Sequence, residues 1–296
     1  TVEGKRIIAT YSEKRARKDA HERQKLVEKA HPKRIRFAAD ALRKGATAQE
    51  VADRSGIDRW FLERIQIFLE GEEILQNEPW PLETESLQWI KSKGWTDRAI
   101  GQFLKISEDQ VRIDREKQGV FGRFHVVDTC AAEFEAQTNY LYSSYQGADE
   151  SKISHRKKIM ILGGGPNRIG QGIEFDYCCV HAAMALRDLG VETLMVNSNP
   201  ETVSTDFDIS DKLYFEPLTP EFVLNISRME KPDGVIVQFG GQTPLKIAKS
   251  IEAGGLKVIG TSTEAIDAAE DRERCDEISS SLKPLGLLQP PATLAR

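Results

Sequence analysis

Two different hydrophobic patterns follow one another along the chain. Between residue 33 and about residue 118, apolar residues recur every three or four positions, which is the spacing of amphipathic helices. From residue 158 onward, helical stretches alternate with short, continuous apolar runs at 158–162, 191–197, 212–215, 234–238 and 256–259. Apolar strands that alternate with helices are typical of a parallel sheet covered on both faces. The pattern therefore predicts an α + α/β protein, with an all-helical N-terminal domain followed by a parallel-sheet domain.

The helical half contains a weak internal repeat. Thr47 and Thr96 occupy corresponding positions, and so do Ile57 and Ile106, at the same sequence offset. Each copy predicts a short helix, a turn and a second helix. Thr47 with Glu50 forms a capping-box pattern, and Ser107 is placed to cap the last helix.

A short helix, a turn and a second helix also describe a DNA-binding helix-turn-helix. A recognition helix should offer Arg, Lys, Asn or Gln to base edges and phosphates. The second helix of the later copy instead carries Glu108, Asp109, Asp114 and Glu116 among its basic residues, and acidic helices repel phosphate. Packed helical hairpins are therefore favoured over nucleic-acid binding.

The segment 126–145 has neither a helical nor a strand-like pattern, and it contains Tyr140, Tyr142 and Tyr145. We interpret it as a connector fixed by its aromatic side chains. The polar stretch 146–154 then predicts a domain boundary near residue 150, so that residues 1–150 form the helical domain.

Composition narrows the class of protein. Of the 296 residues, 40% are hydrophobic and 29% are charged, which excludes a mostly disordered chain. No apolar run approaches the roughly 20 residues of a membrane span, and the N-terminus has no apolar signal region. Four cysteines are too few for a disulfide scaffold, so a cytoplasmic location and no membrane partner are expected. The first methionine is Met160, and we expect the chain to be part of a longer protein.

Three loops follow predicted strands of the second half: Gly163–Gly172, Asn197–Asp206 and Gln238–Thr243. All three are rich in small and polar residues. Because ligands of parallel sheets bind at the carboxyl ends of the strands, we expect these loops to line one shared site. The candidate loop residues are Asn197, Asn199, Thr202, Gln242 and Thr243.

The sequence pattern disfavours a dinucleotide as the ligand. The dinucleotide fingerprint requires Asp or Glu at the end of the second strand, where this chain has Asn197. Pro166 removes an N–H from the glycine loop, and no Lys-Ser/Thr pair follows the glycines as in a Walker A loop. No metal site is predicted, and Cys178 and Cys179 are expected to be buried structural thiols.

Several long motifs resemble the large chain of carbamoyl phosphate synthetase. In the second half they are Lys158–Ala182, Val196–Asp206, Lys212–Pro217, Gly234–Leu245 and Ala269–Arg274. In the first half they are Ile57–Leu62 and Val127–Phe134. The resemblance covers about residues 30–275, and Cys275 stands where the family usually has an aromatic residue.

The resemblance implies a place for each part of the chain. Residues 1–150 resemble the helical oligomerisation domain, and residues 151–268 resemble the Rossmann-like pre-ATP-grasp domain that opens the second synthetic half. Residues 269–296 resemble the start of an ATP-grasp domain, nearly all of which lies outside this sequence. Arg168, Gly172 and Glu174 resemble the wall of the carbamate tunnel at the second active site, and no residue of the chain is assigned as catalytic.

The resemblance also implies the chemistry of the parent enzyme. The family is a carbon–nitrogen ligase that makes carbamoyl phosphate for arginine or pyrimidine biosynthesis, from bicarbonate, glutamine-derived ammonia and two ATP. ATP and Mg would be bound mainly by the ATP-grasp domain, so this chain alone is expected to be inactive. A glutamine amidotransferase small chain and other copies of the large chain are the implied partners. The alternative is a helix-turn-helix regulator with a ligand-sensing Rossmann-like domain.

Overall fold

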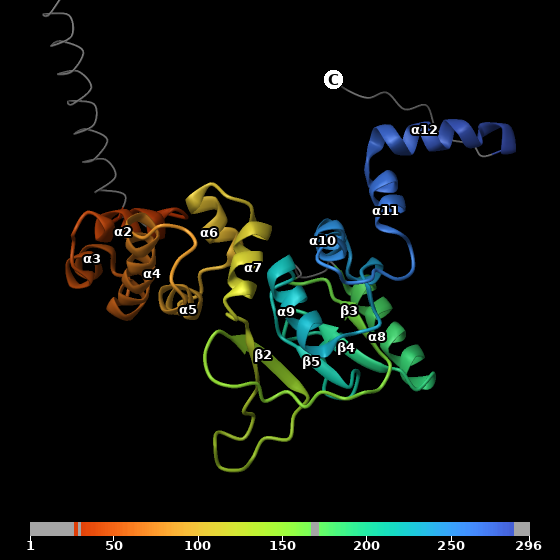
Figure 1. The fold of residues 1–296 in the computed structure, drawn as a ribbon, viewed down its shortest axis with the longest axis horizontal. Helices are drawn as coiled ribbons and strands as arrows, with labels where there is room; N and C mark the ends of the chain where they lie inside the picture. Colours follow the sequence, from red (N-terminus) through yellow and green to blue (C-terminus); the bar gives the residue numbers. More distant parts are fainter. Residues whose placement is uncertain (1–26, 29–30, 167–171, 287–296) are drawn as a thin grey trace, which may run out of the picture. The chain divides into compact units, whose positions relative to one another are not determined.

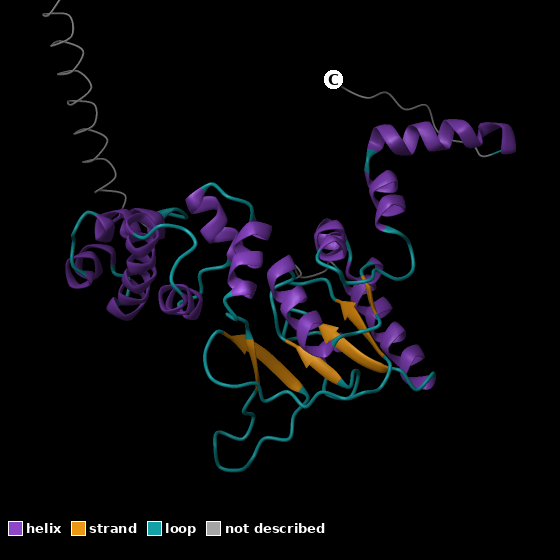
Figure 2. Cartoon of the chain, viewed as in Figure 1, coloured by secondary structure: helices purple, strands orange, loops and turns teal. Residues whose placement is uncertain are grey.

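The computed structural model describes residues 27–28, 31–166 and 172–286 (Figure 1). The chain divides into two compact units, Thr1–Val120 and Phe121–Arg296. In the described residues the first unit is helical, and the second carries all the strands (Figure 2). In that part of the chain no helix is long and apolar enough to cross a bilayer.

Six helices of the first unit are described: α2 (Arg34–Arg43), α3 (Ala48–Ser55), α4 (Arg59–Asn77), α5 (Thr84–Ser92), α6 (Asp97–Leu104) and α7 (Glu108–Lys117). The strong helix formers of residues 19–30, which end before Pro32, also predict a helix, and most of that segment lies outside the described residues.

The internal repeat is confirmed as two helical hairpins, α3–α4 and α6–α7. Thr47 and Thr96 are the N-caps of the first helix of each copy, and Thr47 forms the full capping box with Glu50. Each turn passes through one residue with left-handed backbone, Gly56 in the first copy and Lys105 in the second. The second helices are capped by side chains at corresponding positions, Asp58 and Ser107.

The interior of the first unit combines apolar side chains with one buried ion cluster. Asp97 accepts hydrogen bonds from Lys91 (2.7 Å) and Arg115 (2.9 Å), and all three side chains are fully buried. Trp95 stacks on Phe68 with ring centroids 4.3 Å apart. Removing one partner from such a cluster would leave a buried charge unpaired.

Two apolar residues that share the helical spacing of buried neighbours lie on the surface. Ile35 and Phe61 are more than half exposed, beside the exposed Trp60. Their helices bury neighbouring positions, such as Ala38 and Leu62. A period of 3.6 residues indicates which face of a helix is apolar, but not how much of that face is buried. Residues at the margin of the face therefore cannot be assigned to the core from their spacing alone.

The second unit is built on one six-stranded sheet. Its strands are β1 (Arg123–Val126), β2 (Tyr140–Ser144), β3 (Lys158–Leu162), β4 (Glu192–Val196), β5 (Lys212–Tyr214) and β6 (Gly234–Ile236), in the spatial order β1-β2-β5-β4-β3-β6. All neighbouring pairs are parallel except β1 with β2. The helical elements of this unit are α8 (Ile173–Asp188), η1 (Val203–Thr205), α9 (Pro220–Glu230), η2 (Gln238–Gly240), α10 (Gln242–Ala253), α11 (Thr263–Glu270), α12 (Arg272–Leu282) and η3 (Lys283–Leu285).

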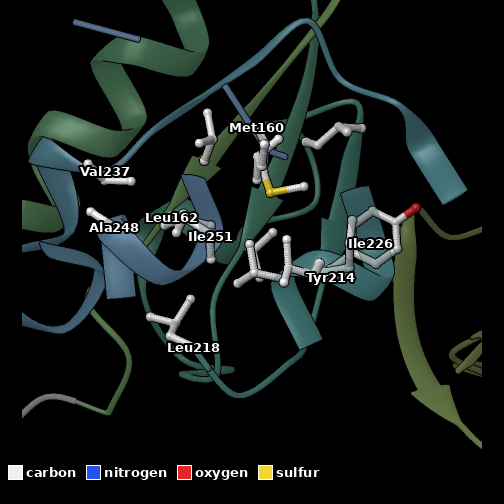
Figure 3. Packing of buried hydrophobic residues seen from close by; sticks show 14 of the residues in the cluster. Met160, Leu162, Tyr214, Leu218, Ile226, Val237, Ala248 and Ile251 are labelled. Carbon is white, nitrogen blue, oxygen red and sulfur yellow. The ribbon is translucent and has the colours of Figure 1, made fainter. Parts of the chain in front are cut away.

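Both faces of the sheet are covered, as the continuous apolar strands predict. On one face, alternate strand residues such as Met160 and Leu162 pack against Ile226 of α9 and Ile251 of α10 (Figure 3). On the other face, Ile161 and Met195 pack beneath α8 together with Cys179 and Ala183 of that helix. The coarse α + α/β prediction is therefore confirmed.

The interpretation of residues 126–145 as a connector is wrong in part. β1 and β2 pair antiparallel, and β2 extends the parallel sheet beside β5, so both strands precede the sequence-based boundary at residue 150. β2 has a single buried residue, Leu141, and pairs with β5 at only two residues, Tyr140 with Leu213 and Leu141 with Tyr214. A strand this short shows no clear alternation of apolar and polar residues in the sequence. On the other side of β1, the N–H groups of Phe124 and Val126 donate to the carboxylates of Asp149 and Glu150.

The strand expected at residues 256–259 is reduced to a single parallel bridge between Val235 and Val258. Two backbone hydrogen bonds flank it, from Val235 to Lys257 and from Ile259 to Val235. The run therefore lies along the edge of the sheet, with Leu256 buried, without becoming a regular strand.

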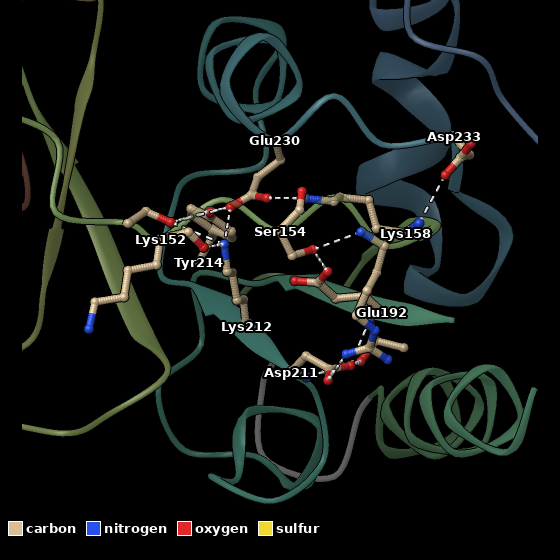
Figure 4. Close-up of polar contacts among 12 residues, drawn as sticks. Lys152, Ser154, Lys158, Glu192, Asp211, Lys212, Tyr214, Glu230 and Asp233 are labelled. Carbon is tan, nitrogen blue, oxygen red and sulfur yellow. Dashed lines mark hydrogen bonds and ion pairs between the residues drawn. The ribbon is translucent and has the colours of Figure 1, made fainter. Parts of the chain in front are cut away.

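Buried charges join the amino ends of the strands (Figure 4). Lys158, at the start of β3, donates to Glu230 at 2.9 Å, and Lys212, at the start of β5, donates to the same carboxylate at 2.6 Å. The hydroxyl of Tyr214 also donates to Glu230. Asp233 accepts from the backbone N–H of Lys158 at 2.9 Å. The network attaches the first residues of β3 and β5 to the end of α9.

Candidate functional site

The candidate site lies where the strand order changes direction. β3 has β4 on one side and β6 on the other, so the chain leaves β3 in one direction and later returns on the opposite side. In open parallel sheets this switch point creates a crevice at the carboxyl ends of the strands. The loops after β3, β4 and β6 all begin at this edge.

Close backbone contact joins the loops after β3 and β6. A Cβ atom on Gly240 would lie 2.4 Å from the carbonyl oxygens of both Leu162 and Gly163. Gly241 has a φ of +69°, and a Cβ there would lie 2.9 Å from the ring of Phe175, in the first turn of α8. Glycine at position 240 therefore lets two backbone segments meet with no side chain between them, and glycine at position 241 leaves room for the ring of Phe175.

Asn197 joins the loops after β3 and β4. Its Oδ1 accepts hydrogen bonds from the backbone N–H of Gly165 (3.0 Å) and of Asn199 (3.2 Å). The side chain is almost fully buried, and a Cβ on Gly163 would lie 2.6 Å from its Nδ2. An acidic side chain here would hold ribose hydroxyls in a dinucleotide site, whereas this amide is used to hold the protein's own loops.

The loop after β4 is also attached to α8. The buried carboxylate of Asp176, in the first turn of α8, accepts from the backbone N–H of Ser204 at 3.1 Å. Thr202 caps η1 through reciprocal hydrogen bonds with Thr205. These contacts fix the path of the loop beside the start of the helix.

The structure brings some of the predicted site residues together. A Cβ on Gly165 would lie 3.5 Å from Ser198 Oγ and 4.0 Å from Thr243 Cγ2, so the three loops converge around this glycine. Asn197 lies beneath them. Asn199 uses its side-chain oxygen to accept from the backbone N–H of Glu201.

Other predicted residues point elsewhere or are not described. Gln242 donates to the carboxylate of Glu270 in α11 at 3.1 Å, on the wall of a small cleft of about 230 Å³ between α10 and α11. Gly172 is buried as the N-cap of α8 with a φ of +87°, and Glu174 is exposed in the first turn of that helix. Arg168 lies outside the described residues.

Sequence reasoning missed Asp176, Ser198, Ser204 and Gly240 as parts of this edge. Ser198 and Ser204 lie inside the predicted site loop Asn197–Asp206, so their position in the chain indicates that they could belong to the site. In the sequence, Asp176 is only an acidic residue in the first turn of a predicted helix. Stabilisation of the helix dipole is a sufficient reason for such a residue, so nothing indicates its contact with the loop after β4.

The two adjacent cysteines of α8 differ in exposure. Cys179 is fully buried, and burial raises the pKa of its thiol to about 12. The expectation that Cys178 is also buried is wrong, because its side of α8 faces solvent. In the described part of the chain, no group of three or more His, Cys, Asp or Glu side chains could hold a metal ion.

Comparison with family models agrees with the division of the chain. Residues 3–119 match the carbamoyl-phosphate synthetase large chain, oligomerisation domain, and residues 155–268 match the carbamoyl phosphate synthase preATP-grasp domain. The chain belongs to the carbamoyl phosphate synthetase large-chain family. The helix-turn-helix regulator considered as an alternative is not supported.

Individual members of this family are similar over most of the chain. The carbamoyl phosphate synthase large chain of Neisseria meningitidis serogroup B is 54% identical over 89% of this chain and 24% of that protein. The large chain of Haemophilus ducreyi is 54% identical over 90% of this chain and 24% of its own length. This chain therefore spans about a quarter of the length of these relatives.

Among solved structures, N5-carboxyaminoimidazole ribonucleotide synthetase from Thermus thermophilus is similar with a TM-score of 0.32 and 23% identity. The alignment covers 45% of this chain and 31% of that one.

Proposed function

We propose that this chain acts as part of the large chain of a glutamine-dependent carbamoyl phosphate synthetase. The reaction would convert bicarbonate, ammonia from glutamine and two ATP into carbamoyl phosphate. The identity of more than half with large chains along nearly the whole sequence supports this assignment. A glutamine amidotransferase small chain would then be the partner protein, and the cytoplasm the site of action, in arginine or pyrimidine biosynthesis.

Each part of the chain would have its own role. The helical domain, assigned from the sequence to residues 1–150, would supply assembly contacts with other copies. Residues 151–268 would be the Rossmann-like pre-ATP-grasp domain of the second synthetic half, and residues 269–296 the start of an ATP-grasp domain. ATP and Mg would be bound mainly by that later domain, as the resemblance to the family implies.

The observation that supports the proposed role is the close contact of backbone segments where the loops converge. Gly240 allows the loop after β6 to meet the backbone carbonyls of Leu162 and Gly163. Gly165 lies beside the short side chains of Ser198 and Thr243, and Asn197 holds its loop by a hydrogen bond. A small molecule passing this edge would contact backbone and short polar groups. We therefore assign this edge, with Arg168, Gly172 and Glu174, to the wall of the carbamate tunnel at the second active site.

Substitution of Gly172 in a full-length large chain tests the assignment. Gly172→Leu should block carbamoyl phosphate formation, while glutamine hydrolysis and bicarbonate-dependent ATP cleavage continue. Because Gly172 has a positive φ, any side chain also strains the backbone by about 1 kcal/mol. Gly172→Ala is the matched control, since it carries the same strain but little bulk.

The tunnel assignment stands if both variants lose the same small amount of stability, Gly172→Ala still makes carbamoyl phosphate, and Gly172→Leu does not. Equal loss of synthesis and stability in both variants would contradict it. The isolated 296-residue chain is expected to release no phosphate from ATP with bicarbonate and ammonia. Steady release above a heat-killed control would show that the chain carries a complete ATP site.

A further inference from the structure

Two buried carboxylates attach the end of β2 to the rest of the sheet. Glu216, just after β5, accepts a hydrogen bond from the backbone N–H of Ser143 in β2. Glu221, in the first turn of α9, accepts from the hydroxyl of Tyr145 at 2.6 Å, and Asn225 donates to the same hydroxyl at 3.2 Å. Glu216 and Glu221 are only 3% and 2% exposed, so the second unit itself encloses both groups.

The β1–β2 hairpin has a short edge against the sheet. β1 is the outermost strand and pairs with β2, which pairs with β5 at two residues. The N–H groups of Leu213 and Phe215 donate to carbonyls of β2 and of the residue before it, at 2.9 and 2.8 Å. Segments with a short edge open without unfolding of the whole domain, so the glutamate contacts affect how often this hairpin separates from the sheet.

The surroundings of Glu216 favour its protonated form. Burial raises the pKa of Glu216 to about 7, and the charge of Glu221 adds to the rise, whereas hydrogen bonds from Ser143 compensate only partly. Two carboxylates that share one buried place resist being charged together. An exposed glutamate has the ordinary pKa of 4.5, so above that pH separation of the hairpin is accompanied by loss of the proton.

Charged side chains on the neighbouring elements have other partners. Arg228 of α9 lies over the ring of Phe121 at 4.0 Å and donates to the carbonyl of Gly122. On the hairpin, two further pairs join Arg123 with Asp149 and His125 with Glu150. Among the described residues, the neighbouring charge that acts on the pKa of Glu216 is that of Glu221, which raises it.

We propose that protonation of Glu216 controls the attachment of the β1–β2 hairpin to the sheet. With its proton, Glu216 stays buried against Ser143 and beside Glu221. Without the proton, the same place holds an added negative charge, and separation of the hairpin gives that charge access to water. The hairpin directly follows the helical unit in the chain, so its separation lengthens the connection between the two units. All of these contacts lie within the second unit, so the control does not depend on the proposed function.

Hydrogen exchange of backbone amides in the 296-residue chain tests this control, with each rate divided by the intrinsic rate at the same pH. The amides of Leu213 and Phe215 report separation of the hairpin, because both donate to it. The amide of Gly163 donates to Val196 in β4 and reports opening at the centre of the sheet. The hairpin amides should open more often than that of Gly163.

The direction of the pH effect follows from the two pKa values of Glu216. Its contribution to attachment is complete below about pH 4.5 and is lost as the pH rises to 7. Opening at Leu213 and Phe215 should therefore be on the order of 50-fold more frequent at pH 8 than at pH 5.

Three variants assign the effect to Glu216. Glu216→Gln carries no charge at either pH and should remove most of the 50-fold difference. Glu221→Gln removes the neighbouring charge, so the increase in opening should be complete at a lower pH than in wild type. His125→Gln is the matched control on the hairpin, because histidine is the side chain that ordinarily titrates in this range, and it should leave the pH dependence unchanged.

Equal opening at Phe215 and Gly163 in wild type would overturn the proposal, because the hairpin would then separate only when the whole unit unfolds. A pH dependence that persists in Glu216→Gln, or one that is lost in His125→Gln, would also overturn it. An unchanged pH range in Glu221→Gln would contradict the coupling between the two glutamates. Circular dichroism of each variant verifies that it is folded.

Discussion

The carboxyl edge and the amino edge of the sheet are built from different side chains, although the same strands supply both. At the carboxyl edge, Gly163 and Gly240 bring backbone segments into direct contact and a neutral amide, Asn197, holds the loops. At the amino edge, Lys158 and Lys212 converge on the buried Glu230. Close backbone contacts and an amide hold the carboxyl edge together, whereas buried ion pairs hold the amino edge together.

The two edges also differ in the pKa of a buried glutamate, which is Glu230 at the amino edge and Glu216 at the carboxyl edge. Burial would raise the pKa of Glu230, but hydrogen bonds from Lys212, Tyr214 and Lys158 outweigh it and hold the pKa below its ordinary value. Burial raises the pKa of Glu216, just after β5, to about 7, and the nearby Glu221 adds to the rise. A backbone N–H, from Ser143, is the partner of Glu216, and it compensates burial only partly.

The difference between the two edges indicates where a fold can accommodate buried charge. Ion networks require several bulky side chains in fixed positions, so they suit an edge where nothing has to pass or bind. An edge that leaves room for a ligand must instead be held by backbone contacts and short polar groups. Substitutions at the two edges should therefore fail for different physical reasons.

The largest effect is expected at the amino edge. Glu230→Ala leaves two lysines without their shared carboxylate, and Lys158 is almost fully buried, so the second unit should lose about 3–5 kcal/mol of unfolding free energy. Urea titration followed by labelling of the buried Cys179 thiol measures this unit specifically. Glu277→Ala, at an exposed position of α12, is the control and should change little. A loss below about 1 kcal/mol would mean that the network does not stabilise the edge.

The second prediction concerns pH. The folded pKa of Glu216, about 7, lies above the ordinary value of 4.5, so its contribution to stability is complete below about pH 4.5 and is lost as the pH rises through 7. Glu216→Gln removes this loss, and the variant should gain about 2–3 kcal/mol relative to wild type between pH 5 and pH 8. Urea denaturation followed by circular dichroism at both pH values measures the difference. A difference that is constant with pH would contradict the assignment to Glu216.

The smallest of the three effects is steric. Gly240→Ala places a Cβ against two backbone carbonyls that cannot rotate away, and should cost about 2 kcal/mol through displaced loops. Gly190→Ala is the comparison, because Gly190 has a φ of +71° and open space around it, so only backbone strain of about 1 kcal/mol applies. If the two variants lose equal stability in urea, close approach at the carboxyl edge is not a separate constraint.

Much of this arrangement was predictable from local pattern. The sequence patterns predict the end residues of β3 and α9 correctly, because β3 is a continuous apolar run and Pro220 starts α9 at a position where proline is favoured. The caps Thr47, Asp58 and Ser107 were predictable, since each acts on a backbone N–H two or three residues away.

Features that depend on distant partners were not predictable in this way. β2 is a strand because β5 lies beside it, and nothing in its own five residues requires that. The Glu230 network joins residues from 154 to 230, and no spacing rule relates them. Gln242 and Thr243 are neighbours in the first turn of α10, yet only Thr243 lies near Gly165, because α11 provides a partner for Gln242.

The carboxylates beside β1 have a consequence for solubility. An outermost strand with free N–H groups can template a strand from another molecule and so start aggregation. Asp149 and Glu150 occupy the N–H groups of Phe124 and Val126, and they place two negative charges where an incoming strand would pair. The sheet can therefore grow by a strand at this side only after residues 149–150 are displaced, and that requirement protects a short, half-exposed hairpin from fibril formation.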